Sequence, residues 1–185
     1  MLIEVHIHGI VRLRPGINLH DLDSAFQPFL EYLGVESINN VTSLYHDESG
    51  ISFDSKNQLL DICWSGEVEN SFPTKIEFSF TRLNTFSDSA SEIEVSYYDE
   101  EDNEEISVIF VGPSLASIHE IQRLRMTEEV AKLISRHFDD SATQEVVDLV
   151  NDLFARDWTK RENKIANNVF DNNLLIPLSG RRVLH

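Results

Sequence analysis

The chain of 185 residues fits one domain around a single hydrophobic core, and its 41% hydrophobic and 25% charged residues exclude a compositionally disordered protein. Charge is its extreme property, because 32 acidic residues against 15 Lys and Arg give a formal net charge of −17. Residues 113–185 hold 11 acids and 10 bases, which leaves 21 acids and 5 bases, a net charge of −16, for residues 1–112. Such a field repels nucleic-acid phosphates and anionic lipids, so direct binding to nucleic acid or to a membrane is not expected.

The sequence also predicts a compartment. No apolar run approaches the roughly 20 residues that cross a bilayer, and the N-terminus leads directly into a strand-like segment instead of a signal peptide. The single cysteine, Cys63, cannot form an internal disulfide, which is the usual situation in a reducing compartment. We therefore expect a cytoplasmic protein.

The N-terminal segment predicts a strand followed by a helix. In residues 2–8 apolar side chains alternate with polar ones, which is typical of a half-buried strand whose polar side carries Glu4, His6 and His8. After a turn, Asn18 is expected to cap a helix, with Asp21 at its third position. Apolar residues then recur at helical spacing, and Gly34 is expected to end the helix in a left-handed conformation.

Residues 41–111 change to a period of two, which predicts a series of short strands. The expected strands cover residues 41–45, 51–53, 59–64, 75–83, 93–98 and 106–111. In the fourth strand, Phe78 is expected in the core and Glu77 on the opposite, exposed face. The acidic run 99–105 is expected to form an exposed hairpin tip, and connections this short require antiparallel neighbours.

The last third predicts helices. Residues 113–138 carry an apolar stripe, and Ser141 and Gln144 form a capping-box pattern before a second helix that reaches Trp158. The fold class is therefore α+β: a mainly antiparallel sheet of about six or seven strands, with an N-terminal helix and two C-terminal helices packed on one face as a two-layer sandwich. We expect a single domain over residues 1–165, strand-rich and acidic to 112 and helical from 113, and a partly ordered Asn-rich tail over 166–185.

The strand alternation predicts which side chains face solvent on the open side of this sheet. They form an acidic surface dotted with Ser and Thr: Glu4, His6, His8, Asp61, Cys63, Glu77, Ser79, Thr81, Glu94, Ser96, Tyr98, Glu105 and Ser107.

Motifs for catalysis are weak. His6 and His8 point the same way at i and i+2, a spacing that lets two imidazoles share a metal ion if carboxylates lie nearby, although two polar residues on a solvated strand are commoner. The turn His46-Asp47-Glu48 could add ligands. Cys63 has no basic neighbour in the sequence that would favour a thiolate. Gly-rich phosphate loops, CxxC pairs and HExxH helices do not occur, so no cofactor is expected.

Two functions follow from these patterns. The leading hypothesis is a non-enzymatic protein-binding module that captures or inhibits a basic protein partner, in an inhibitor, immunity, anti-restriction or chaperone-like role. Its expected binding residues are the acidic side chains and the tyrosine of the sheet face and hairpin: Glu77, Glu94, Tyr98, Asp99, Glu100, Glu101, Asp102, Glu104 and Glu105. The alternative is a small metal-dependent hydrolase that uses His6 and His8 with Glu4, Asp61 or Glu77. Exposed aromatic rings at Tyr98 and Trp64, with the apolar residues 174–178, also suggest a homo-oligomer.

Overall fold

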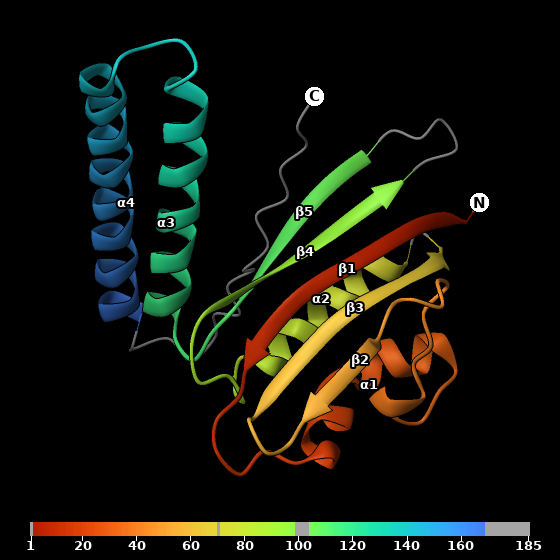
Figure 1. The fold of residues 1–185 in the computed structure, drawn as a ribbon. Coiled ribbons are helices and arrows are strands. Elements are labelled where there is room, and N and C mark those ends of the chain that lie inside the picture. Colours follow the sequence, from red (N-terminus) through yellow and green to blue (C-terminus); the bar gives the residue numbers. More distant parts are fainter. Residues whose placement is uncertain (1, 70, 99–103, 169–185) are drawn as a thin grey trace. The chain divides into compact units, whose positions relative to one another are not determined.

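The computed structural model describes residues 2–69, 71–98 and 104–168, with side chains described as far as residue 162. Five strands and four α-helices make up this part of the chain, so the predicted α+β class is confirmed (Figure 1). The elements follow one another as β1 (Ile3–Arg12), α1 (Leu19–Leu33), the short 3-10 helix η1 (Ile38–Asn40), β2 (Gly50–Asp54), β3 (Leu59–Val68), α2 (Phe72–Leu83), β4 (Ser91–Tyr98), β5 (Glu104–Val111), α3 (Leu115–Ile134) and α4 (Asp140–Asn168).

The strands form one antiparallel sheet in the order β2-β3-β1-β4-β5. The first strand of the chain is therefore central. Ile7 lies opposite Trp64 on β3 and opposite Val95 on β4, and all three side chains point to the same face. This face is buried, since Val5, Ile7 and Val11 of β1 are fully enclosed.

Helices α1 and α2 pack side by side on this buried face (Figure 1). Aromatic rings join the two layers: Phe26 of α1 meets Phe80 of α2 edge to face, and Phe29 meets the indole of Trp64 in the same way. Gly66 makes room for that indole, because a Cβ at residue 66 would lie 2.4 Å from a ring carbon of Trp64. The prediction that Trp64 is exposed was wrong, and its Nε1 donates to the carbonyl oxygen of Thr42 at 3.0 Å.

The termini of α1 confirm the sequence analysis. The Asn18 side chain accepts from the Asp21 backbone N–H at 3.1 Å, and the Asp21 carboxylate accepts from the Asn18 N–H at 3.0 Å. This reciprocal pair satisfies two N–H groups that would otherwise lack partners at the start of the helix. Gly34 follows the last turn with φ of 71°, the left-handed conformation that glycine adopts without steric strain.

The segment predicted as a fourth strand, residues 75–83, is helix α2, so that prediction was wrong. Pro73 stands in its first turn, where proline is favoured. The buried positions Phe72, Ile76, Phe80 and Leu83 recur at helical spacing, and Ile76 and Phe80 fit a period of two as well as a helical one. Phe78 is consequently 56% exposed, and Glu77, Ser79 and Thr81 lie on the helix instead of the open sheet face.

Two further corrections concern the strands. Residues 41–45 form a loop instead of a strand, which leaves five strands where about six or seven were expected. In β5, Glu105 lies opposite Tyr97 and Ser107 lies opposite Val95, so both are on the side of the helices. The apolar positions Ile106, Val108 and Phe110 therefore lie on the open side, the reverse of the expected faces, because the pairing register with β4 decides which way an edge strand points.

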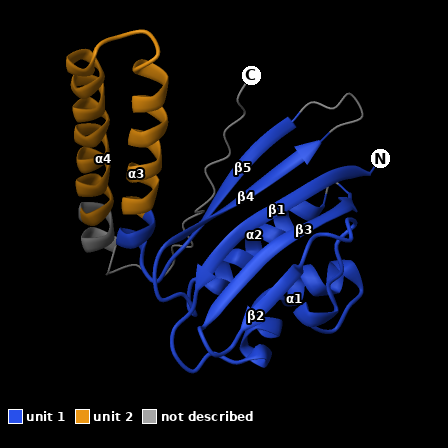
Figure 2. Ribbon diagram, viewed as in Figure 1, with its two compact units in different colours: residues 1–118, 178–185 blue, residues 119–177 orange. Residues whose placement is uncertain are grey.

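Residues 1–118 and 119–177 group into two compact units, and helices α3 and α4 form the second as an antiparallel hairpin (Figure 2). Within the first unit the helices that pack on the sheet are α1 and α2, and the sequence predicted the first of these but assigned residues 75–83 of α2 to a strand. Helix α4 starts one residue before the expected Ser141 cap, because the Asp139 carboxylate accepts from the Ala142 N–H at 2.9 Å. The single domain over 1–165 stays a prediction, and the expected tail lies from residue 169 outside the described residues.

The ring of His119 lies in the seam between the two helices of the hairpin. It contacts the rings of Phe154 and Trp158, with centroids 5.2 and 4.9 Å away. Its Nε2 is buried and makes no hydrogen bond within the described residues, since the Asp157 carboxylate is 3.7 Å away. Burial is the main cause that lowers the pKa of His119, and the nearby positive charge of Arg161 lowers it further. None of the described helices is long and apolar enough to span a bilayer.

A pair of phenylalanines in α2 tests the assignment of its faces. Phe80→Ala should lower the free energy of unfolding by about 3 to 5 kcal/mol, because a fully buried ring is lost. Phe78→Ala should change it by less than about 1 kcal/mol, because that ring lies mostly in solvent. Urea unfolding of both variants provides the comparison, and equal losses would contradict the helical assignment.

The seam of the hairpin should respond to acid. A histidine whose pKa is lowered on folding binds fewer protons in the folded state than in the unfolded state. The neutral ring therefore contributes fully to the free energy of unfolding above its ordinary pKa of 6.5. This contribution is lost as the pH falls through the lowered pKa of the folded state. We expect His119→Gln to reduce the loss of stability between about pH 7.5 and about pH 5. The exposed His137 provides the matched control, and His137→Gln should leave the pH dependence of urea unfolding as in the wild type.

Candidate functional site

The open face of the sheet, on the side away from α1 and α2, is strongly acidic. The strand registers place seven carboxylates on it: Glu4, Asp54, Asp61, Glu67, Glu92, Glu94 and Glu104. Among the described strand positions of this face, Arg12 is the one Lys or Arg, and His6 and His8 are the imidazoles. The acidic open face predicted from strand alternation is thus present, although its members differ from the expected set.

The residues predicted to bind a partner do not all lie on one surface. Glu94, Tyr98 and Glu104 lie on the open face, on the neighbouring strands β4 and β5. Glu77 lies on α2 and Glu105 on the helix side of β5, so neither belongs to this surface. The remaining four, Asp99, Glu100, Glu101 and Asp102, lie outside the described residues.

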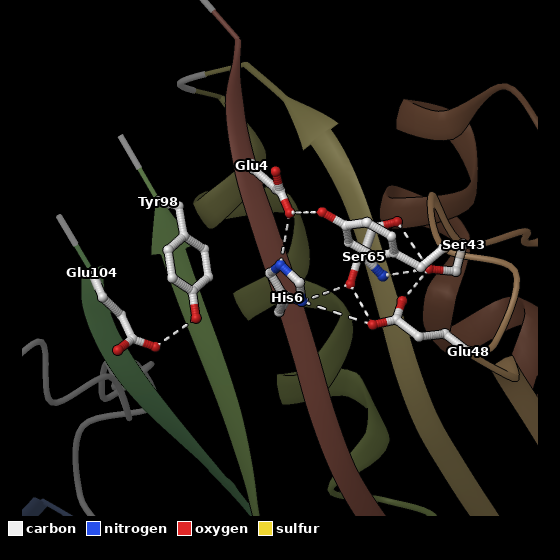
Figure 3. Close-up of polar contacts among 8 residues, drawn as sticks. Glu4, His6, Ser43, Glu48, Ser65, Tyr98 and Glu104 are labelled. Atoms are coloured by element: carbon white, nitrogen blue, oxygen red, sulfur yellow. Dashed lines mark hydrogen bonds and ion pairs between the residues drawn. The ribbon is translucent and has the colours of Figure 1, made fainter. Parts of the chain in front are cut away.

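A hydrogen-bonded group of six side chains, here called the His6 cluster, occupies the open face where the loop before β2 lies beside β3 (Figure 3). It consists of Glu4, His6, Ser43, Tyr45, Glu48 and Ser65. His6 is central because β1 is central: its Cα lies opposite Ser65 on β3 and opposite Ser96 on β4. The loop is held to β3 by its backbone as well, since the Leu44 N–H donates to the Ser65 carbonyl oxygen at 2.8 Å.

One side of the His6 cluster centres on the Glu4 carboxylate. Its Oε1 lies 2.8 Å from Nε2 of His6 and accepts from the hydroxyl of Tyr45 at 2.6 Å. The hydrogen bond from Tyr45, followed by that from His6, lowers the pKa of Glu4, because both stabilise the ionised carboxylate. The same contact raises the pKa of Tyr45, because a phenolate would face a negative charge.

The other side centres on Glu48. The Ser65 hydroxyl donates to Oε1 of Glu48 at 2.7 Å, and the Ser43 hydroxyl donates to Oε2. Ser43 Oγ also accepts from the backbone N–H of Ser65 at 2.8 Å. Through these contacts the carboxylate connects the loop to β3, and Ser65 is only 1% exposed beneath it.

The imidazole of His6 joins the two sides of the cluster. Its Nδ1 lies 2.8 Å from the hydroxyl oxygen of Ser65, which donates to Glu48, and its Nε2 lies 2.8 Å from the Glu4 carboxylate. The ring therefore connects Glu4 of β1 with Glu48 of the loop through Ser65 of β3.

Two tyrosines flank the imidazole of His6. Tyr45 stacks on it with ring centroids 5.7 Å apart, and Tyr98 meets it edge-on at 5.1 Å. The Tyr98 hydroxyl donates to Oε1 of Glu104 at 2.7 Å, and that bond raises the pKa of Tyr98. Each tyrosine thus contributes an aromatic face beside a carboxylate, as Figure 3 shows for Tyr98 and Glu104.

The geometry does not favour nucleophilic or metal chemistry. Ser65 is only 1% exposed, so its hydroxyl, which hydrogen bonds with Glu48 and His6, is not accessible to a substrate in this structure. Both ring nitrogens of His6 already have partners, and His8 lies farther along β1 opposite Cys63 and Glu94. No group of three or more His, Cys, Asp or Glu within the described residues is arranged to hold a metal ion.

Sequence reasoning found Glu4 and His6 but missed the rest of the cluster. Glu48 was considered only as part of a turn, and Tyr45 was assigned to a strand that does not form. Ser65 lay one residue past the predicted end of its strand, which continues to Val68. The sequence did contain a signal for Ser65. It is a polar residue that follows the apolar Trp64, and it therefore continues the alternation of β3 with its side chain on the open face.

The cluster predicts a loss of stability when Ser65 is replaced. Ser65→Ala removes the donor to Glu48 and the acceptor from His6, so we expect the free energy of unfolding to fall by about 1 to 3 kcal/mol. Exchange of the Leu44 amide hydrogen should also become faster, because the loop loses a connection to β3. Ser52→Ala, at an exposed position of β2 on the same face, is the control and should change stability by less than about 0.5 kcal/mol. Similar losses in both variants would contradict the role given to the cluster.

Comparison with known proteins places the chain in a family. No curated protein and no solved structure matches it. A family model described as a family of unknown function (DUF6806) matches residues 3–155, which include every strand of the sheet, the His6 cluster and α3. Because this match covers most of the chain, the protein belongs to that family of unknown function, DUF6806.

Proposed function

We propose that this chain is a non-enzymatic protein-binding module whose open sheet face captures a basic segment of a protein partner. The observation that carries the proposal is the composition of that face, on whose described strand positions seven carboxylates accompany one Arg. A field of one sign accelerates the encounter with a partner of the opposite sign and repels partners of the same sign.

The tyrosines add a reason to expect Lys and Arg side chains as the groups recognised. A guanidinium or ammonium is attracted both to a carboxylate and to the face of an aromatic ring. In the pairs Tyr98–Glu104 and Tyr45–Glu4 the tyrosine hydroxyl donates a hydrogen bond to the carboxylate, so an aromatic ring and a negative charge lie side by side. Tyrosine also contributes much to the energy of protein interfaces, because a large ring is immobilised at small entropic expense.

The His6 cluster would prepare this surface in advance. Hydrogen bonds fix Glu4, Tyr45 and Glu48 before a partner arrives, so less side-chain entropy is lost on binding. His6 contacts the Glu4 carboxylate and Ser65, and the carboxylates of the open face supply the negative charge for a ligand. The biological roles that use such a surface are inhibition or neutralisation of a basic protein, mimicry of DNA charge in anti-restriction, and chaperone-like masking.

The alternative function, a metal-dependent hydrolase built on His6 and His8, receives no support from the described residues. Asp61 lies opposite Ile10, farther along the sheet, and Glu77 lies on α2 on the other side of it. Of the three carboxylates expected with the two imidazoles, Glu4 does lie beside His6, 2.8 Å from its Nε2, but no group of three or more possible ligands occurs within the described residues.

Binding of a defined basic probe tests the proposal. A fluorescent peptide rich in Lys and Arg should bind the full chain, and its affinity should fall steeply with salt, while a Glu-rich peptide of equal length should not bind. Replacing Glu92, Glu94 and Glu104 together by Gln should weaken binding by about tenfold, since each charge contributes up to about 1 kcal/mol. Fluorescence anisotropy at low and high salt measures both effects.

A matched variant separates the face from the net charge. Glu31, Glu36 and Glu77 lie on α1, on the turn after it and on α2, and replacing all three by Gln removes the same number of charges. This control should change the affinity by no more than about twofold. If both triple variants weaken binding equally, total charge and not the open face is responsible, and the proposal fails. Indifference of binding to salt would also contradict it.

A further inference from the structure

The side of helix α4 that faces away from α3 carries exposed apolar residues. Phe154 and Trp158 contact His119 of α3, and Asn151 accepts a hydrogen bond from Arg123, so these residues define the side that faces α3. Leu149 and Leu153 are one turn apart on the other side, and they are 54% and 50% exposed. Two exposed leucines one turn apart form a small apolar patch on an otherwise polar side of the helix.

Charged residues extend this apolar pair in a particular order. At 3.6 residues per turn the same side of α4 presents, in sequence, Ala142, Glu145, Leu149, Asp152, Leu153, Arg156 and Lys160. Glu145 precedes the leucines, Arg156 and Lys160 follow them, and Asp152 stands between them. When a second copy lies antiparallel, the acidic residue before the leucines therefore approaches the basic residues after them, as an interface between two identical copies related by a two-fold axis requires.

We propose that α4 is a self-association surface on which two copies of the chain pair their α4 helices antiparallel. Leu149 of one copy then packs against Leu153 of the partner subunit, and the reciprocal contact forms by symmetry. Glu145 lies about one turn before Leu149, and Arg156 lies about one turn after Leu153, so this register brings Glu145 beside Arg156 of the partner subunit. Each of these contacts occurs twice in the dimer.

The charge division of the chain favours a second copy as the occupant. Residues 113–185 carry a net charge of only −1, so two such segments approach without strong repulsion, while residues 1–112 with −16 repel their counterparts. An acidic partner would complement only the half of α4 that carries Arg156 and Lys160. A basic partner would complement only the half that carries Glu145.

The mass of the full chain in solution tests this inference. Sedimentation equilibrium over a wide concentration range should give a concentration-dependent dimer. The double variant Leu149→Glu and Leu153→Glu should raise the dissociation constant at least about 100-fold, because it places four carboxylates in the contact. Leu124→Glu, at a leucine of α3 with the same 50% exposure as Leu153, should leave the dissociation constant within about twofold.

Charge exchange tests the antiparallel register. Glu145→Arg and Arg156→Glu should each weaken the dimer by about tenfold, because each places like charges beside one another. The chain that carries both substitutions should recover the wild-type dissociation constant. Circular dichroism and urea unfolding of each variant show whether the hairpin is retained.

Three results would overturn the proposal. A wild-type chain that stays monomeric at every concentration means that these leucines are covered within the chain or by another protein. A dimer that survives the double leucine variant, or that is lost equally in Leu124→Glu, uses a different surface. A failure of the double charge variant to recover, with both single variants weakened and all variants folded, would exclude this register.

Discussion

The alternation of the central strand β1 is the constraint on which the rest of the structure depends. Every second residue, from Ile3 through Val5 and Ile7 to Val11, points into the core, where the aromatic rings of α1 and α2 cover them. Because β1 pairs with β3 on one side and β4 on the other, its register positions those strands too. Burying the apolar set on one face leaves Glu4, His6 and His8 on the other.

The His6 cluster follows from this central position. An imidazole at the middle of the sheet has a strand on each side, so it can contact Ser65 on β3 and the ring of Tyr98 on β4, while Tyr45 of the loop stacks on it. The imidazole lies between the Glu4 carboxylate and the Ser65 hydroxyl, and that hydroxyl reaches Glu48 in turn. The outcome is a connected polar network on the open face, and the proposal of a preformed surface for Lys and Arg side chains is built on it.

The division of charge along the chain separates two kinds of surface. The sheet unit holds nearly all the negative charge, and its open face repels a second copy of itself. The helical hairpin is almost neutral, and α4 carries leucines flanked by opposite charges. The proposed binding of a basic partner and the proposed pairing of two copies therefore involve different residues, and substitutions can test each separately.

Local patterns in the sequence determined the α+β class, the strand β1 with its polar and apolar faces, the Asn18 cap, the Gly34 end of α1 and the acidic character of the open face. These features depend on spacing within a few residues, which the sequence states directly. Tertiary structure decided the rest. Ile76 and Phe80 fit both a strand and a helix, and packing against Phe26 selected the helix for α2. The faces of β5 depended on its register with β4, and the cluster joins residues 4, 6, 43, 45, 48 and 65 through strand pairings that no local pattern encodes.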